Sequence, residues 1–132
     1  MTKDEIINYI EEMLSSFPIR MSGNEINPRV ANKLRGLAVS DRPSLLEALR
    51  QYLSFRVSPT KRQPEDARPE ARLWLALDVS EYLELYELKP DIESLLQDIR
   101  NGKTLLPVYE NMVARHLQKI SANKTGFPPS RE

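Results

Sequence analysis

The stretch that decides the fold is EARLWLALDVSEYLELYEL, residues 70–88. Leu75, Val79 and Leu83 recur every four residues, which is the spacing of one face of an α-helix. Tyr82 and Tyr86 belong to the same apolar stripe. The residues that widen it past half of the circumference are Leu73, Trp74, Leu77 and Leu85. A helix that is apolar over so much of its surface is buried between neighbours. We therefore predict that residues 70–88 form the central helix of an all-α fold.

Five further segments have helical periodicity, and none alternates as a β-strand does. The signals for helix ends are the Thr2–Glu5 capping-box spacing, Asn27-Pro28 as an N-cap with proline at the first helical position, Asp41-Arg42-Pro43, Pro90, Asn101-Gly102, and Thr104 with Pro107. The residues predicted to face the core are Ile6, Ile10, Met13, Leu14 and Phe17; Val30, Leu34, Leu37 and Ala38; Leu45, Leu46, Leu49, Tyr52 and Leu53; Ile92, Leu95, Leu96 and Ile99; and Val108, Tyr109, Met112, Val113, Leu117 and Ile120. The sequence thus predicts about six helices in antiparallel pairs.

Residues 1–120 are predicted to form a single helical domain. Residues 57–69 contain three prolines and no apolar periodicity, so we expect a loop there between two three-helix halves. Each half is too small to be stable alone, which favours one domain over two. Residues 121–132 are polar and proline-rich and are predicted to form a flexible tail. Short turns between helices fit either a compact helical bundle or an open α-solenoid.

Composition excludes several classes of protein. Of the 132 residues, 40% are hydrophobic and 29% are charged, the balance of an ordinary globular protein. The absence of cysteine excludes disulfides, iron–sulfur clusters and thiolate zinc sites. No apolar run approaches the ~20 residues that span a bilayer, and residues 1–5 are polar, unlike a signal peptide. We expect a cytoplasmic protein with no membrane partner.

No group of residues in the sequence has the pattern of a catalytic or metal site. His116 is the only histidine, so the Glu-x-x-His pairs of a di-iron bundle are absent. Its place at the border of the buried face favours a structural role. The adjacent acids Glu11-Glu12 and Glu65-Asp66 lack apolar surroundings that would raise a pKa. None of the four glycines forms a phosphate-binding loop. We therefore predict no enzyme activity, no metal and no cofactor.

Residues 71–83 and 88–96 together resemble a HEAT-type repeat, in which a second helix begins near a proline-aspartate pair, here Pro90-Asp91. The first half of the chain holds no second copy with matching spacing. In its size, its lack of cysteine and this helix pair, the chain is similar to the small HEAT-like immunity proteins of bacterial polymorphic toxin systems, including those of contact-dependent growth inhibition. The resemblance implies a protein that binds a cognate toxin and covers its active surface.

Charge is unevenly distributed although 19 acidic and 19 basic residues cancel. The residues predicted to bind a partner form an acidic run: Asp78, Glu81, Glu84, Glu87, Asp91 and Asp98. An acidic surface complements a basic protein such as a nuclease toxin. One alternative is a generic adaptor or scaffold. Another is a helix-turn-helix regulator of nucleic acid that uses Lys33, Arg35, Arg42 and Arg50, although a neutral chain gives little attraction to phosphates.

Overall fold

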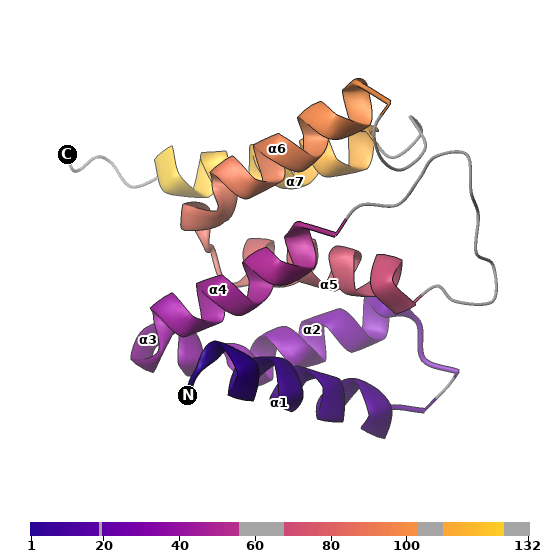
Figure 1. Ribbon diagram of the computed structural model, residues 1–132, viewed down its shortest axis with the longest axis vertical. Helices are drawn as coiled ribbons and strands as arrows, with labels where there is room; N and C mark the ends of the chain where they lie inside the picture. Colours follow the sequence, from indigo (N-terminus) through magenta and orange to yellow (C-terminus); the bar gives the residue numbers. More distant parts are fainter. Residues whose placement is uncertain (19, 56–67, 103–109, 126–132) are drawn as a thin grey trace.

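A computed structural model describes residues 1–18, 20–55, 68–102 and 110–125. Within these ranges the chain is helical and contains no strand, which confirms the all-α prediction. Its elements in chain order are α1 (Lys3–Ser16), α2 (Gly23–Leu34), α3 (Leu37–Ser40), α4 (Arg42–Leu53), α5 (Arg68–Tyr82), the 3-10 helix η1 (Tyr86–Leu88), α6 (Lys89–Arg100) and α7 (Glu110–Thr125) (Figure 1). None of these helices has both the length and the apolar character needed to cross a lipid bilayer.

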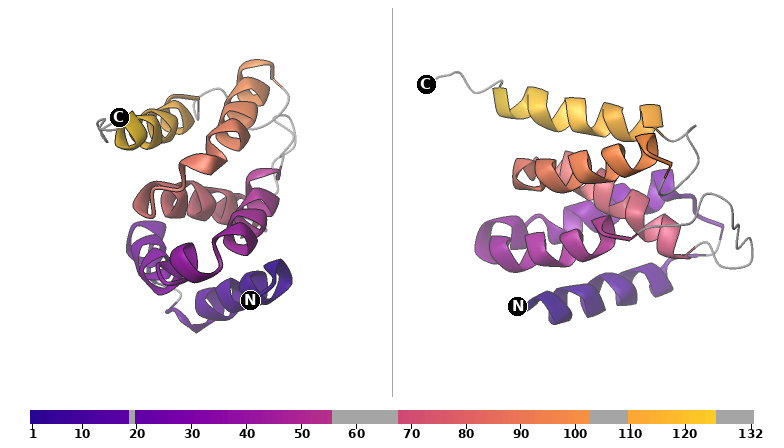
Figure 2. Two further views of the ribbon diagram at one scale, coloured as in Figure 1. Left: turned by 90° about the vertical axis from the view of Figure 1, so that its left-hand side faces the viewer. Right: turned by 45° about the horizontal axis from the view of Figure 1, so that its top comes forward.

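The six longer helices pack in two layers of three. One layer contains α1, α4 and α6, and the other contains α2, α5 and α7, as the left-hand view of Figure 2 shows. Neighbouring helices contact one another within each layer, and α4–α5 and α6–α7 also pair across the layers. The predicted HEAT-type pair is different, because it would place residues 70–88 against residues 90–100. Instead α5 packs against α2 and α4, whereas α6 packs mainly against α7.

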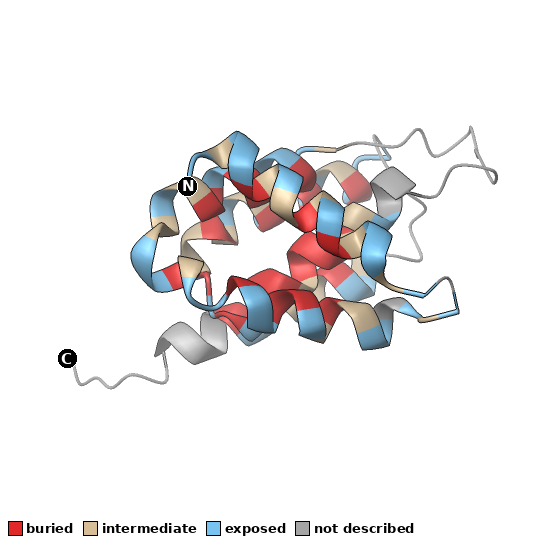
Figure 3. Ribbon diagram, turned by 90° about the horizontal axis from the view of Figure 1, so that it is seen from below, coloured by how far each residue is buried: buried red, intermediate tan, exposed pale blue. Residues whose placement is uncertain are grey.

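One cluster of buried side chains fills the space between the layers. It draws on every longer helix, for example through Ile6, Leu34, Leu49, Leu96 and Val113. Figure 3 shows that the buried residues face the interior and that the exposed residues face outward. The central helix α5 contributes the fully buried side chains Leu73, Leu75, Ala76, Leu77 and Val79. The prediction that this helix lies at the centre of the fold is therefore confirmed.

Several helix ends follow the sequence signals. The backbone N–H of Glu5 donates to Thr2 Oγ1 over 3.2 Å, and the backbone N–H of Thr2 donates to Glu5 Oε1 over 2.7 Å, which is a capping box. Pro43 lies in the first turn of α4, where its missing N–H costs no helical hydrogen bond. Gly102 follows α6 with a φ of 73°, a left-handed conformation that glycine adopts without a steric penalty.

Helix α2 begins earlier than predicted, at Gly23 rather than after Asn27. The Glu25 carboxylate accepts the backbone N–H of Ser22 over 3.2 Å, so the start of the helix is capped one turn before the proline. Pro28 then lies inside the helix, where its nitrogen cannot donate to the carbonyl of Asn24. The prediction that Asn27 is an N-cap is wrong, and Asn27 is instead a buried residue inside α2.

The predicted single helix over residues 70–88 is in fact divided. The helix α5 ends at Tyr82, where the N–H of Leu85 donates to the carbonyl of Ser80 over 2.9 Å and the N–H of Glu84 donates to that of Glu81 over 3.2 Å. These two bonds form a Schellman motif, and Glu84, with a φ of 54°, occupies the position that is usually glycine. No glycine marks the end of α5 in the sequence, and the apolar residues keep their helical spacing beyond it. The sequence therefore predicted one continuous helix.

Three other predictions change at the C-terminal side. Tyr82 and Met112 were expected to face the core, but they are 46% and 41% exposed. Helix α7 continues to Thr125, so residues 121–125 of the predicted tail are helical. The predicted helix start at residues 104–107, the inward residues 108 and 109, residues 57–67 of the predicted loop and residues 126–132 of the tail lie outside the described residues.

Candidate functional site

The central helix α5 reaches the surface along a single stripe. Between Leu73 and Leu83 every residue is buried except four, which are Trp74, Asp78, Glu81 and Tyr82. Their spacing of four, three and one places them on one face of the helix. All four line a cleft of about 460 Å³. The stripe is therefore a concave surface, and its side chains come from the helix at the centre of the fold.

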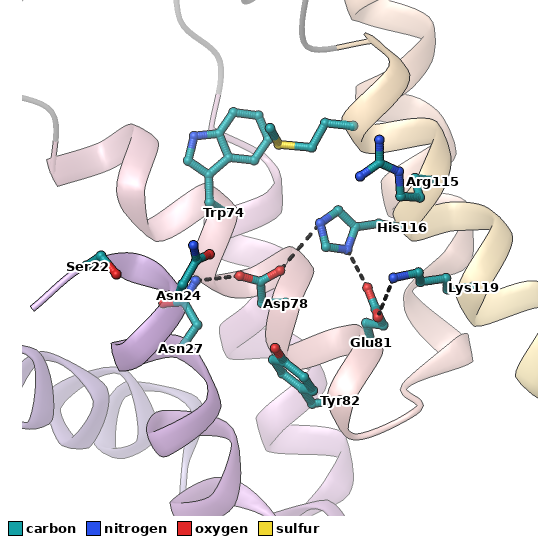
Figure 4. Close-up of a pocket in the computed structure, with 11 residues that line it drawn as sticks. Ser22, Asn24, Asn27, Trp74, Asp78, Glu81, Tyr82, Arg115, His116 and Lys119 are labelled. Atoms are coloured by element: carbon teal, nitrogen blue, oxygen red, sulfur yellow. Dashed lines mark hydrogen bonds and ion pairs between the residues drawn. The ribbon is translucent and has the colours of Figure 1, made fainter.

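This cleft, called here the α2–α5–α7 cleft, lies across the three helices of one layer (Figure 4). Helix α2 and its N-cap contribute Ser22, Asn24 and Asn27. Helix α7 contributes Met112, Arg115, His116 and Lys119, which repeat at intervals of three or four and so share a face. The lining combines charged groups of both signs with exposed apolar side chains. That mixture is typical of a binding surface rather than of a packed core.

A chain of polar contacts crosses the cleft at His116. The Asn27 amide donates to Asp78 Oδ2 over 2.5 Å, and His116 Nε2 lies 3.4 Å from Asp78 Oδ1. On the other side of the ring, His116 Nδ1 lies 2.9 Å from Glu81 Oε1, and Lys119 Nζ lies 3.4 Å from Glu81 Oε2. We call these five residues the His116 cluster. It links all three helices of the layer.

The geometry of His116 is that of a structural group. Its side chain is only 14% exposed, and both of its ring nitrogens face carboxylates. A general base needs one nitrogen directed at the substrate. Although Nδ1 is close to Glu81, it is buried and makes no aligned hydrogen bond among the described residues. The ring therefore lies between two carboxylates of α5 and packs α7 against that helix.

The six acidic residues predicted to bind a partner do not form one open surface. Asp78 and Glu81 lie in the cleft and are paired with the groups just described. Glu87 lies in η1 and Asp91 lies in the first turn of α6, and both are paired with arginines of α4. Glu84 is exposed at the end of α5, and the half-buried Asp98 lies on α6. Lysine or arginine side chains of the same chain already pair with three of the six, Glu81, Glu87 and Asp91, and the prediction that these residues bind a basic partner stays a prediction.

The Arg42–Glu87 pair has the strongest geometry of these internal pairs. Arg42 donates from Nε and Nη2 to the two carboxylate oxygens of Glu87 over 2.6 and 2.7 Å. The same guanidinium donates to the carbonyl of Ala38 over 3.2 Å and lies 5.9 Å from the ring centre of Tyr86. The hydrogen bonds from Arg42 lower the pKa of Glu87 below its ordinary value, an effect that outweighs the opposing effect of burial.

These pairs also bear on the helix-turn-helix alternative. Two of its four basic residues, Arg42 and Arg50, are engaged by Glu87 and Asp91. A third, Arg35, donates to Asn32 over 3.4 Å. An arginine whose charge is compensated inside the fold contributes little to phosphate neutralisation. Moreover, the short helix α3 lies between α2 and α4, so the two predicted helices are not joined by a simple turn.

Most of the cleft was not found from the sequence. Asn27 was assigned to a helix cap, and Tyr82 and Met112 were assigned to the core. A signal was nevertheless present, because Trp74, Asp78 and Glu81 repeat at helical spacing on an otherwise apolar helix. A polar stripe on a central helix marks the side that no neighbour covers.

Among the described residues, no group of three histidine or acidic side chains is arranged to hold a metal ion. No protein-family model, curated protein sequence or solved structure matches the chain. The function is therefore argued from the cleft itself.

Proposed function

We propose that the protein acts by binding another protein at the α2–α5–α7 cleft and that it catalyses no reaction. The observation that carries this proposal is the surface stripe of α5. Every other side of that helix between residues 73 and 83 is buried. Stacked helix pairs commonly use such a layer surface to hold a partner.

The side chains of the cleft favour a protein as the ligand. Tyr82 and Met112 are large apolar residues that stay partly exposed at its edge, and Trp74 is half-buried within it. Tryptophan, tyrosine, methionine and arginine are enriched at the centres of protein interfaces, where they supply much of the binding energy. Trp74, Tyr82 and Met112 expose apolar surface to water in the free protein, and a partner that covers them removes this unfavourable exposure.

Within this class we further propose an immunity role, in which the chain covers the active surface of a cognate toxin domain. Its support is the resemblance in size and in cysteine-free composition to small helical immunity proteins; the HEAT-type helix pair adds nothing to it, because α5 and α6 do not pack as that pair. A generic adaptor function is supported by the same cleft. The two roles differ in the partner, since an immunity protein protects growing cells against one toxin encoded beside it.

The test begins with the partner bound at the cleft. A photoreactive phenylalanine analogue replaces Tyr82 in the full chain inside the native cell, with the same analogue at Val39 as the control. Val39 is 87% exposed and lies on α3, outside the cleft. We expect a protein that is crosslinked from position 82 and not from position 39. That protein is then purified, and its affinity for the chain is measured by calorimetry.

Two substitutions decide the outcome. Tyr82→Ala and Met112→Ala should each weaken binding by about tenfold, and Val39→Ala should change it by less than about twofold. If both cleft variants bind with unchanged affinity, the proposal is wrong. Protection of cells against a toxin encoded next to this chain, lost in the Tyr82→Ala variant, would support the immunity role. Binding without protection would favour the adaptor role.

A further inference from the structure

The two acidic residues of the cleft already have partners within the fold. Asp78 accepts a hydrogen bond from Asn27 and faces one nitrogen of His116. Glu81 faces the other nitrogen of His116 and the ammonium of Lys119. These contacts occupy oxygens of both carboxylates, so a cationic group of a partner would have to displace them. The cleft therefore differs from the acidic rim that the sequence predicts.

Arg115 is the charged residue of the cleft that remains without a partner. It is exposed on α7, and it makes no hydrogen bond or ion pair in the part of the chain that the structure describes. In Figure 4 its guanidinium extends from α7 toward the space between Trp74 and His116. The neighbouring Lys119 shares its charge with Glu81. Arg115 is thus the charged group of the cleft that the fold leaves for a ligand.

We infer that Arg115 receives a carboxylate from an aspartate or glutamate side chain of the protein partner. That a protein carries the carboxylate rests on the proposed function. A guanidinium presents its N–H groups as a planar fork that matches the two oxygens of a carboxylate. Trp74 and Met112 also line the cleft, and a partner that covers them excludes water. An ion pair formed there is stronger than one on an open surface.

Ligands other than a carboxylate fit less well beside Arg115. A basic side chain is repelled by Arg115. A neutral side chain leaves the guanidinium unpaired once the partner excludes water, which carries the cost of desolvating a charge. Asp78 and Glu81 line the same cleft and repel any anion there, and they repel a phosphate more strongly than a carboxylate because a phosphate carries more negative charge. A single carboxylate balances the one uncompensated cation without a large excess of negative charge.

The inference can be tested before the partner is known. The probe is N-acetyl-glutamate N-methylamide, titrated into the full chain while the arginine Nε–Hε signals are followed by nuclear magnetic resonance. The neutral control ligand is the corresponding glutamine compound. The control residue is Arg29, another exposed arginine, which lies on α2 outside the cleft. A third titration uses inorganic phosphate.

We expect the Arg115 signal to shift and saturate with the glutamate probe, with an affinity at least about fivefold above that at Arg29. The glutamine compound should cause no shift, and Arg115→Gln should abolish the response while the remaining spectrum is unchanged. Equal responses at Arg115 and Arg29 would overturn the inference. Tighter binding of phosphate than of the carboxylate at Arg115 would also overturn it, because a phosphate-bearing partner would then fit better.

The crosslinked partner gives the second measurement. Arg115→Glu should weaken its binding by about a hundredfold, Arg115→Lys by about fivefold, and Arg29→Glu by less than about twofold. If Tyr82→Ala weakens binding and Arg115→Glu does not, this inference fails and the proposed function stands. If Arg115 binds the glutamate probe but no cleft variant affects partner binding, the proposed function fails, and the assignment of the carboxylate to a protein partner fails with it.

Discussion

Helix α5 carries two polar clusters that differ in geometry and surroundings. The first, the Glu11 cluster, consists of Glu11 on α1, Tyr52 on α4 and Arg72 on α5. Tyr52 donates to Glu11 over 2.7 Å, and Arg72 donates to both oxygens of the same carboxylate, from Nε over 2.6 Å and from Nη2. The His116 cluster lies on the opposite face of α5, since Arg72 and Glu81 are about two and a half turns apart.

The two clusters make their contacts differently. In the Glu11 cluster one carboxylate receives short, aligned hydrogen bonds from two other helices, and burial and the bond to Glu11 together raise the pKa of Tyr52. In the His116 cluster two contacts are as long as 3.4 Å, and the groups lie beside an open cleft. Short and fully aligned bonds indicate a cluster that holds helices together. Longer bonds beside a cleft indicate side chains that can adjust to a ligand.

The largest expected effect tests the first half of this comparison. Arg72→Ala leaves the Glu11 carboxylate with only Tyr52 as a donor within the cluster, in a site where the two ionic side chains are 23% and 36% exposed. We expect a loss of about 2–3 kcal/mol in the free energy of unfolding, measured in urea. The control is Arg50→Ala, which breaks the more exposed pair with Asp91 and should cost under about 1 kcal/mol. Equal losses would mean that the Glu11 cluster is an ordinary surface pair.

The second prediction concerns acid stability at the Arg42–Glu87 pair. Because Arg42 lowers the pKa of Glu87 in the folded state, the unfolded chain binds a proton at this residue more readily than the folded chain does. The contribution of Glu87 is therefore complete above its ordinary pKa of 4.5 and is lost as the pH falls through the lower folded value. The free energy of unfolding should fall by about 1 kcal/mol more in the wild type than in Glu87→Gln between pH 6 and pH 3. Parallel pH profiles of the two proteins would contradict the pairing.

The smallest expected effect lies in the His116 cluster. His116→Gln removes the ring, but Asp78 keeps the Asn27 amide and Glu81 keeps Lys119. We expect a loss of no more than about 1 kcal/mol in the free energy of unfolding, because each carboxylate retains one partner. The same variant should alter partner affinity more than stability, since the ring lines the cleft. A loss as large as that of Arg72→Ala would show that the two clusters have the same structural role.

The fold was largely predictable because its signals are local. Apolar periodicity identified the longer helices, and capping residues and prolines placed several of their ends. Two of the errors in boundaries, at the start of α2 and at the end of α5, also have local causes. Asn27-Pro28 imitates a helix start, and Glu84 adopts a left-handed conformation without being glycine. At both helix ends the boundary is set by hydrogen bonds that residue type alone does not specify.

The cleft was less predictable because it depends on which helices become neighbours. Periodicity assigns Tyr82 and Met112 to an apolar face, but it does not say where the covering helix stops. The partners of His116 come from α5, and the nearer of the two in the sequence, Glu81, is 35 positions away. The acidic run was correctly identified as a local concentration of charge. Its pairing with Arg42, Arg50 and Lys119, and the contact of Asp78 with His116, appear only in the packed structure.

The central position of α5 has a consequence for how the chain folds during synthesis. The contacts that join α5 to the first half of the chain connect residues far apart in the sequence, with separations of 61 for Glu11–Arg72 and 51 for Asn27–Asp78. The apolar faces of α1, α2 and α4 therefore leave the ribosome before the helix that covers them exists. Helices α1 and α4 can pack against each other early, but the faces of α2 and α4 that contact α5 stay uncovered until residues 68–82 emerge, and α6 and α7 complete the core after that.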